Sequence, residues 1–248
     1  MKLNTKKVIF IILGVIFAIL LVLIVIDSIA IYENRDNYSG NIKCSLQNIP
    51  ILRRICGDTS DIIVKKPALY FYPVQTEEIN VKLNFEGNIF KYPAYDNDLG
   101  WNIVAKPTGE LNVGDRSYDY LFWEGKTEAS LNFDLTKGFI VKKENVVNFL
   151  EENLSKFGLN DKEKSEFIIY WAPIMQGNEN TLVHFATKGE YDDILPIEIS
   201  PKPDNFNRLF MVIKSVSSKY RVTEQSITKF DRSGYNVLEW GGANLDEK

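Results

Sequence analysis

Hydrophobic and polar positions follow three different patterns along this chain, and each pattern predicts a different kind of element. Residues 8–26 form a continuous apolar run without a charged side chain. Between residues 61 and 141 apolar residues often recur at every second position, as in EINVKLNF (78–85), which is typical of half-buried strands. The spacing is helical in KKENVVNFLEENLSKFG (142–158) and in DKEKSEFIIYW (161–171), and strand-like runs return afterwards.

The two helical segments carry their own end signals. Gly158 follows the first as a C-terminal cap, and Asn160 begins the second with Glu163 three residues later, the pattern of a capping box. We expect the second helix to end before Pro173, because proline lacks the N–H that would continue it. Together the patterns predict an α+β fold.

The predicted domains follow from these patterns. An N-terminal transmembrane helix precedes a polar, cysteine-bearing stalk at residues 27–60. The exported globular domain, residues 61–248, would then divide into a β-rich, sandwich-like half (61–141) and an α+β half with a helical hairpin (142–248).

The apolar run is about long enough to cross the ~30 Å hydrocarbon core of a bilayer. Lys2, Lys6 and Lys7 precede it and acidic residues follow, so residues 1–7 are expected in the cytoplasm and the rest outside. A cleaved signal peptide is the alternative, although its apolar core is usually roughly 7–15 residues and a small-residue cleavage site follows it. We therefore expect a single-pass signal anchor that holds an extracytoplasmic domain at the cell membrane.

Cysteine content and charge narrow the chemistry further. Cys44 and Cys56 are the only two cysteines, and in an oxidising exterior such a pair predicts a disulfide. Their spacing does not match a zinc site, and the single histidine, His184, lies far along the chain, so no metal is expected. The net charge of −4 argues against a nucleic-acid partner.

Several segments resemble an uncharacterised family of exported or membrane-anchored microbial proteins. They are KPALYFYP (66–73), AKPTGEL (105–111), YDYLFWEG (118–125) and YNVLEWGG (235–242). The resemblance covers most of residues 65–242 and implies a single integrated unit. Since the family has no established activity, the resemblance implies no functional residues.

Two carboxylates, Glu124 in FWEG and Glu239 in LEWGG, are the most enzyme-like feature of the chain. Facing each other across a cleft, they could hydrolyse a glycosidic bond, one as acid and the other as base or nucleophile. Trp123 and Trp240 could then stack on sugar rings. The competing interpretation is a pair of strand-edge glutamates, each bound to Lys or Arg beside core tryptophans.

Other chemistry has little support in the sequence. His184 would have to serve any Ser-His-Asp or Cys-His arrangement, but the chain has no Gly-x-Ser-x-Gly elbow, and a structural role is favoured. There is no phosphate-binding Walker loop, so no nucleotide or other cofactor is expected.

Aromatic residues crowd the first half of the domain, and most of them are expected in the core. The alternative is a shallow binding platform, since Tyr and Trp also supply recognition surfaces. The candidate binding residues are Tyr92, Tyr95, Trp101, Trp123 and Trp240. We therefore predict a non-enzymatic binding or interaction module at the cell envelope, whose partner is a protein or an envelope polymer. A tethered envelope glycan hydrolase that uses Glu124 and Glu239 is the alternative.

Overall fold

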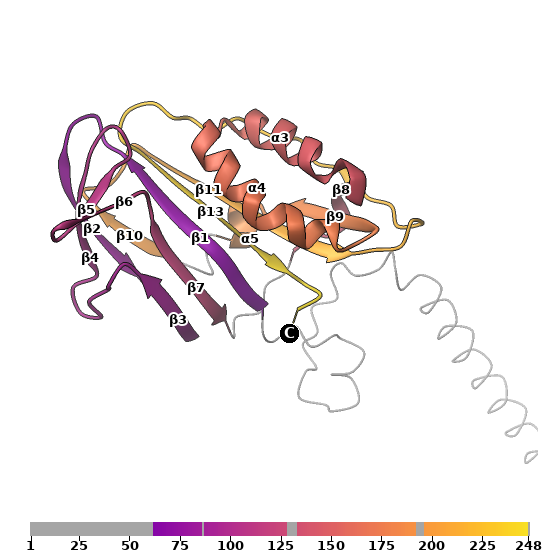
Figure 1. Cartoon of the computed structure of the whole chain (residues 1–248), viewed down its shortest axis with the longest axis horizontal. Coiled ribbons are helices and arrows are strands. Elements are labelled where there is room, and N and C mark those ends of the chain that lie inside the picture. The colour runs from indigo at the N-terminus through magenta and orange to yellow at the C-terminus, as the bar shows by residue number, and fades with distance from the viewer. Residues whose placement is uncertain (1–61, 86, 128–132, 192–195, 248) are drawn as a thin grey trace, which may run out of the picture. The chain divides into compact units, whose positions relative to one another are not determined.

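A computed structural model of the chain describes residues 62–85, 87–127, 133–191 and 196–247, which form two β-sheets and a pair of packed helices (Figure 1). Of these residues 46% lie in strands and 20% in helices, so the fold is mostly β and the predicted α+β class is wrong. The strands are β1 (Ile62–Tyr72), β2 (Glu77–Leu83), β3 (Gly87–Tyr92), β4 (Trp101–Ala105), β5 (Leu111–Val113), β6 (Arg116–Tyr118), β7 (Leu121–Thr127), β8 (Lys137–Lys142), β9 (Asn180–Phe185), β10 (Ile197–Ser200), β11 (Asn205–Ser215), β12 (Thr223–Glu224) and β13 (Asn236–Asn244).

Both sheets mix strands from the two predicted halves of the domain, which is why the expected division was wrong. The larger sheet has the order β12-β8-β9-β11-β13-β1-β7-β3, and the smaller one has the order β10-β2-β4-β5-β6. In the larger sheet β1 pairs antiparallel with both β13 and β7, and β13 pairs parallel with β11. In the smaller sheet β10 returns from the second half to pair with β2. Long-range pairing of this kind leaves no trace in local periodicity.

The two predicted helices form α3 (Val146–Phe157) and α4 (Asp161–Gln176), with the short helices η1 (Lys143–Asn145) and α5 (Lys188–Tyr191) elsewhere. Gly158 ends α3 in the left-handed conformation at φ 89°, and Asn160 and Glu163 form the predicted capping box. Helix α4 nevertheless runs on through Pro173, contrary to prediction. Both Pro173 and Ile169, whose carbonyl loses its partner, are exposed, so water can satisfy that carbonyl.

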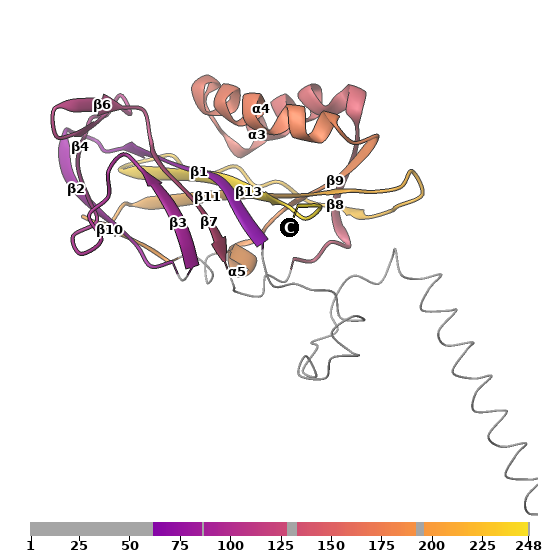
Figure 2. The same ribbon diagram turned by 60° about the horizontal axis from the view of Figure 1, so that its bottom comes forward.

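The larger sheet is buried on both faces at its centre. Helices α3 and α4 cover one face, as Figure 2 shows, and the smaller sheet packs against the other. Strand β13 is buried from Asn236 to Ala243, with Leu238 and Trp240 toward the helices and Val237 toward the smaller sheet. Burial on both faces explains why Val237 and Leu238 are consecutive apolar residues here, rather than alternating with polar ones.

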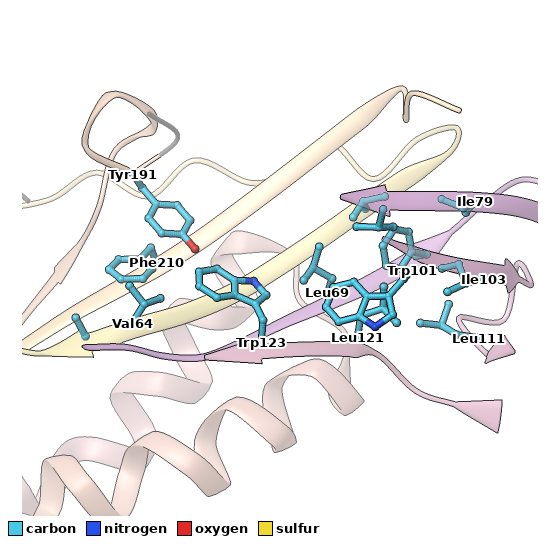
Figure 3. Close-up of a cluster of buried hydrophobic side chains, with 14 of the residues drawn as sticks. Val64, Leu69, Ile79, Trp101, Ile103, Leu111, Leu121, Trp123, Tyr191 and Phe210 are labelled. Atoms are coloured by element: carbon cyan, nitrogen blue, oxygen red, sulfur yellow. The ribbon is translucent and has the colours of Figure 1, made fainter. Parts of the chain in front are cut away.

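The core between the two sheets contains the largest side chains of the first half of the domain (Figure 3). Trp101 and Trp123 are each 1% exposed, and Leu69 from β1 is fully buried with them. At one end of this core Tyr191 of α5 stacks on Phe210 of β11, with ring centroids 4.2 Å apart. The aromatic excess of the sequence is therefore mainly a packing feature.

Within the described residues no helix is both long enough and apolar enough to cross a membrane. The expected anchor at residues 8–26 and the expected stalk at 27–60 lie outside the described residues, as do Cys44 and Cys56. The transmembrane helix and the disulfide are therefore not supported by the structure. The location at the cell membrane stays a prediction.

Candidate functional site

Glu124 and Glu239 lie on opposite faces of the larger sheet. Trp123 and Glu239 share one face, because the Trp123 indole Nε1–H donates to Glu239 Oε1 at 3.0 Å. Glu124 follows Trp123 in a regularly paired part of β7, so strand alternation turns it to the other face. There its Oε2 accepts the backbone N–H of Lys66 at 3.2 Å. The structure does not bring the two carboxylates together.

Glu239 belongs to a buried polar cluster. Its side chain is 1% exposed, and Arg208 Nε, from a side chain only 7% exposed, donates to Oε2 at 2.6 Å. The Arg208 guanidinium lies 4.2 Å from the ring centre of Tyr191. Burial, and next the charge of Glu239, raise the pKa of the Tyr191 phenol well above its ordinary value, so this hydroxyl stays neutral. A carboxylate compensated in this way fits a structural role.

The predicted binding residues divide sharply by exposure. Trp101, Trp123 and Trp240 are at most 1% exposed, so none of the three rings is available to a partner. Tyr95 is half-buried and packs edge-on against Trp101, with ring centroids 4.8 Å apart. Tyr92 differs, since 49% of its surface is exposed.

Tyr92 is part of an aromatic surface at the edge of the larger sheet, which we call the β3–β7 patch. The patch consists of Phe90, Tyr92, Tyr118, Tyr120 and Phe122. The pairs Phe90–Phe122 and Tyr92–Tyr118 have ring centroids 5.9 and 5.7 Å apart. Phe90 is 61% exposed, more than any other phenylalanine of the described residues.

The helices leave this face of β3 and β7 uncovered. The buried residues beneath α3 and α4 come from β1, β8, β9, β11 and β13 among the strands, and none of them lies in β3 or β7. Figure 1 places β3 at the edge of the sheet, away from both helices. Aromatic rings that would pack under a helix elsewhere in this sheet therefore face solvent here.

A strained residue brings charge to the patch. Lys66 occupies a bulge of β1 at φ 53°, a conformation that is uncommon for residues other than glycine. Its Nζ donates to Tyr120 Oη at 2.9 Å and lies 4.8 and 5.0 Å from the ring centres of Tyr120 and Phe122. The Lys66 ammonium group supplies the patch with a cation. The Glu124 carboxylate, which accepts the Lys66 backbone N–H, supplies an anion. Such strain is often found at functional positions.

Sequence reasoning missed Phe90 and Lys66. The alternation of Phe90 and Tyr92 in GNIFKY is visible in the sequence, but it does not show that this strand lies at the uncovered edge of the sheet. The sequence does not predict the strain at Lys66, because the following Pro67 favours extended backbone at Lys66 rather than a positive φ.

His184 is buried, and both of its ring nitrogens have hydrogen-bond partners. It is 1% exposed, its Nδ1 lies 2.9 Å from the Lys137 carbonyl oxygen, and its Nε2 lies 3.1 Å from Glu190 Oε2. Glu190 also accepts the backbone N–H groups of Asp134 and Thr187, both at 2.7 Å. Across the described part of the chain no group of three His, Cys, Asp or Glu side chains is placed to hold a metal ion.

A comparison with known proteins shows similarity to an uncharacterized bacterial protein. The chain is 40% identical over 62 residues to an uncharacterized protein in the bglA 3′ region of Butyrivibrio fibrisolvens. The match covers 24% of this chain and 65% of that protein, so the chain spans less than two thirds of its relative. No family model and no solved structure matches the chain. The family resemblance stays a prediction.

Proposed function

We propose that this chain is a non-enzymatic binding module that holds a protein or polymer partner on the β3–β7 patch. The observation that carries the proposal is the exposure of Phe90 and Tyr92, at 61% and 49%, on an uncovered face of an edge strand. Large exposed aromatic residues that cluster on one surface are characteristic of recognition sites.

The patch has the composition that recognition requires. An aromatic side chain buries about 150–250 Å², and at about 25 cal/mol per Å² the two half-exposed rings could together contribute roughly 4–7 kcal/mol to binding. Lys66, Glu124 and the Tyr120 hydroxyl lie beside these rings and supply polar groups that can orient a partner. Strands β3, β6 and β7 hold Phe90, Tyr92, Tyr118 and Phe122, so little conformational entropy is lost on binding.

Glycan hydrolysis by Glu124 and Glu239 gains no support from the geometry. The sheet separates the two carboxylates, and Glu239 is fully buried and bound to Arg208. A hydrolase needs both groups within about 5–10 Å of each other on either side of one sugar linkage. No other observation favours this second function.

A comparative capture experiment tests the proposal. The full-length chain would be immobilised and exposed to an envelope extract, in parallel with a Phe90→Ala/Tyr92→Ala variant and with a Val147→Ala control on exposed α3. We expect a partner that the wild-type chain and the control capture and the double variant does not. Titration of the purified partner should then show at least a tenfold weaker affinity for the double variant. Equal affinity for all three proteins would contradict the proposal.

A further inference from the structure

A second site lies away from the patch, where strand β11 runs past the end of β9. A cavity of about 490 Å³ opens there, within the roughly 300–1,000 Å³ range of small-molecule sites. Its lining comes from the end of α3, the end of β9, α5, the first half of β11 and the segment 225–230. We call it the β11 cavity.

The register of the strands creates the cavity. Met211 is the first residue of β11 to pair with β9, opposite Phe185, so residues 205–210 extend beyond that strand. The last backbone bond between the two segments runs from Ala186 N–H to Phe210 O at 2.8 Å. Beyond that bond a connecting segment, rather than a strand, lies beside β11, and the gap between them is the cavity.

The outer wall of the cavity, formed by segment 225–230, is fixed on both sides. The Gln225 carboxamide bonds both backbone groups of Phe185, accepting at 2.9 Å and donating at 3.0 Å. Just beyond the segment, Arg232 donates to both oxygens of the fully buried Glu163, at 2.8 and 3.1 Å. The cavity is therefore preformed, which lowers the entropic cost of binding.

Aromatic rings make up most of the apolar wall. On the helix side Phe157 lies 5.0 Å from Phe185 and 5.2 Å from Phe230, between ring centroids. On the opposite side are Tyr191 and Phe206, the two rings over which the Arg208 guanidinium lies. Tyr191 is only 3% exposed, so a flat aromatic ligand would meet chiefly the half-buried rings of Phe230 and Phe206, which favours stacked or edge-on contacts.

The two cationic side chains that line the cavity do not favour a charged ligand. Arg208 is compensated from the interior by Glu239 at 2.6 Å, and Lys188, the other cation of the lining, is exposed, so solvent screens it. The remaining polar groups are uncharged, and they include the hydroxyls of Thr187, Ser226 and Thr228. The Ser226 and Thr228 hydroxyls can donate to or accept from substituents of a bound ring, and the Thr187 hydroxyl, which donates to Glu190 at 2.9 Å, can accept.

We infer that the β11 cavity binds a small, uncharged aromatic molecule that carries hydroxyl substituents. The inference does not depend on the β3–β7 patch, since the two sites share no residue. The cavity holds such a molecule by ring contacts with its aromatic walls and orients it through the hydroxyls at its rim.

Fluorescence titration of the full-length chain with 2-naphthol tests the inference. We expect saturable 1:1 binding that Phe230→Ala weakens about tenfold, because one ring of the helix-side wall is lost. Thr228→Trp fills the cavity from an exposed position and should abolish binding without removing a core contact. Val147→Ala, at an exposed position of α3 outside both the cavity and the β3–β7 patch, is the matched control and should leave the affinity unchanged. Thermal unfolding of each variant verifies that it is folded.

Two further probes test the chemical class. Decahydro-2-naphthol keeps the skeleton and hydroxyl without the aromatic rings, and naphthalene-2-sulfonate keeps the rings with a fixed negative charge. Both should bind more weakly than 2-naphthol. Tighter binding of either probe would overturn the proposed class. Absence of saturable binding, or wild-type affinity in the folded Phe230→Ala and Thr228→Trp proteins, would overturn the site itself.

Discussion

The indole N–H of Trp123 donates to the carboxylate of Glu239 at 3.0 Å, from β7 to β13 across the intervening strand β1. This bond joins the FWEG and LEWGG segments, which lie far apart in the sequence. It joins them through a tryptophan and one glutamate, whereas the two glutamates face away from each other. Because Arg208 holds the second oxygen of Glu239, the junction is a buried polar cluster of the core.

Substitution of Glu239 should destabilise the fold strongly. Glu239→Gln removes the negative charge that pairs with the largely buried Arg208 guanidinium, and breaking a buried pair typically costs about 3–5 kcal/mol. Urea unfolding of the purified chain would measure the loss. Glu124→Gln is the matched control, because Glu124 is only half-buried, and it should change the free energy of unfolding by less than about 1 kcal/mol. Equal effects of the two substitutions would show that Glu239 has no special structural weight.

The Glu190 carboxylate should make the fold sensitive to acid. Burial alone would raise its pKa, but hydrogen bonds from the Asp134 and Thr187 N–H groups and the Thr187 hydroxyl, with the charge of His184, lower it below its ordinary value of 4.5. Glu190 therefore contributes stability above about pH 4.5, and this contribution is lost as the pH falls through the lower pKa of the folded state. Unfolding measured between pH 6 and 3 should show a shallower loss of stability in Glu190→Gln. An unchanged slope would contradict this assignment.

The sequence predicts the individual helices and strands of this fold better than the pairing between strands that are distant in the chain. Helix α3, the start of α4 and strand β2 follow from periodicity and capping residues, which are local signals. The pairing of β1 with β13 and of β2 with β10 depends on contacts between distant segments, which no local pattern specifies. An expected division into two halves was wrong for this reason.

The candidate site was only partly predictable for a related reason. Tyr92 and the buried tryptophans have similar sequence surroundings, and their exposure depends on which part of the sheet the helices cover. The β11 cavity arises because residues 205–210 of β11 extend beyond the end of β9. The register between these two strands, which local sequence does not specify, determines this extension. Gln225 carries no sequence signal for its two bonds to the Phe185 backbone.

Gly242 should not tolerate a side chain. A Cβ built there would lie 2.2 Å from the Met211 carbonyl oxygen and 2.6 Å from Trp171 Cζ2, so β13 or α4 would have to move. Gly242→Ala should cost about 1–3 kcal/mol or more, seen as a lower Tm. Gly189→Ala is the control, since no atom lies within 4 Å of its added Cβ, and its Tm should change little. A wild-type Tm for Gly242→Ala would contradict the close approach of α4 to the sheet.

Lys66 offers a way to separate backbone strain from side-chain contacts at the β3–β7 patch. Lys66→Ala removes the bond from Nζ to Tyr120 and the contacts with the Tyr120 and Phe122 rings, but it keeps a side chain at φ 53°. Lys66→Gly removes the same contacts and also relieves the strain, which costs roughly 1–2 kcal/mol for residues with a Cβ. We therefore expect Lys66→Gly to be more stable than Lys66→Ala by about 1 kcal/mol in urea unfolding, although glycine gains more entropy in the unfolded state. Both variants should bind the partner of the patch equally weakly, because both lack the ammonium group. A less stable Lys66→Gly would show that the bulge is not strained, and wild-type affinity in both variants would remove Lys66 from the binding surface.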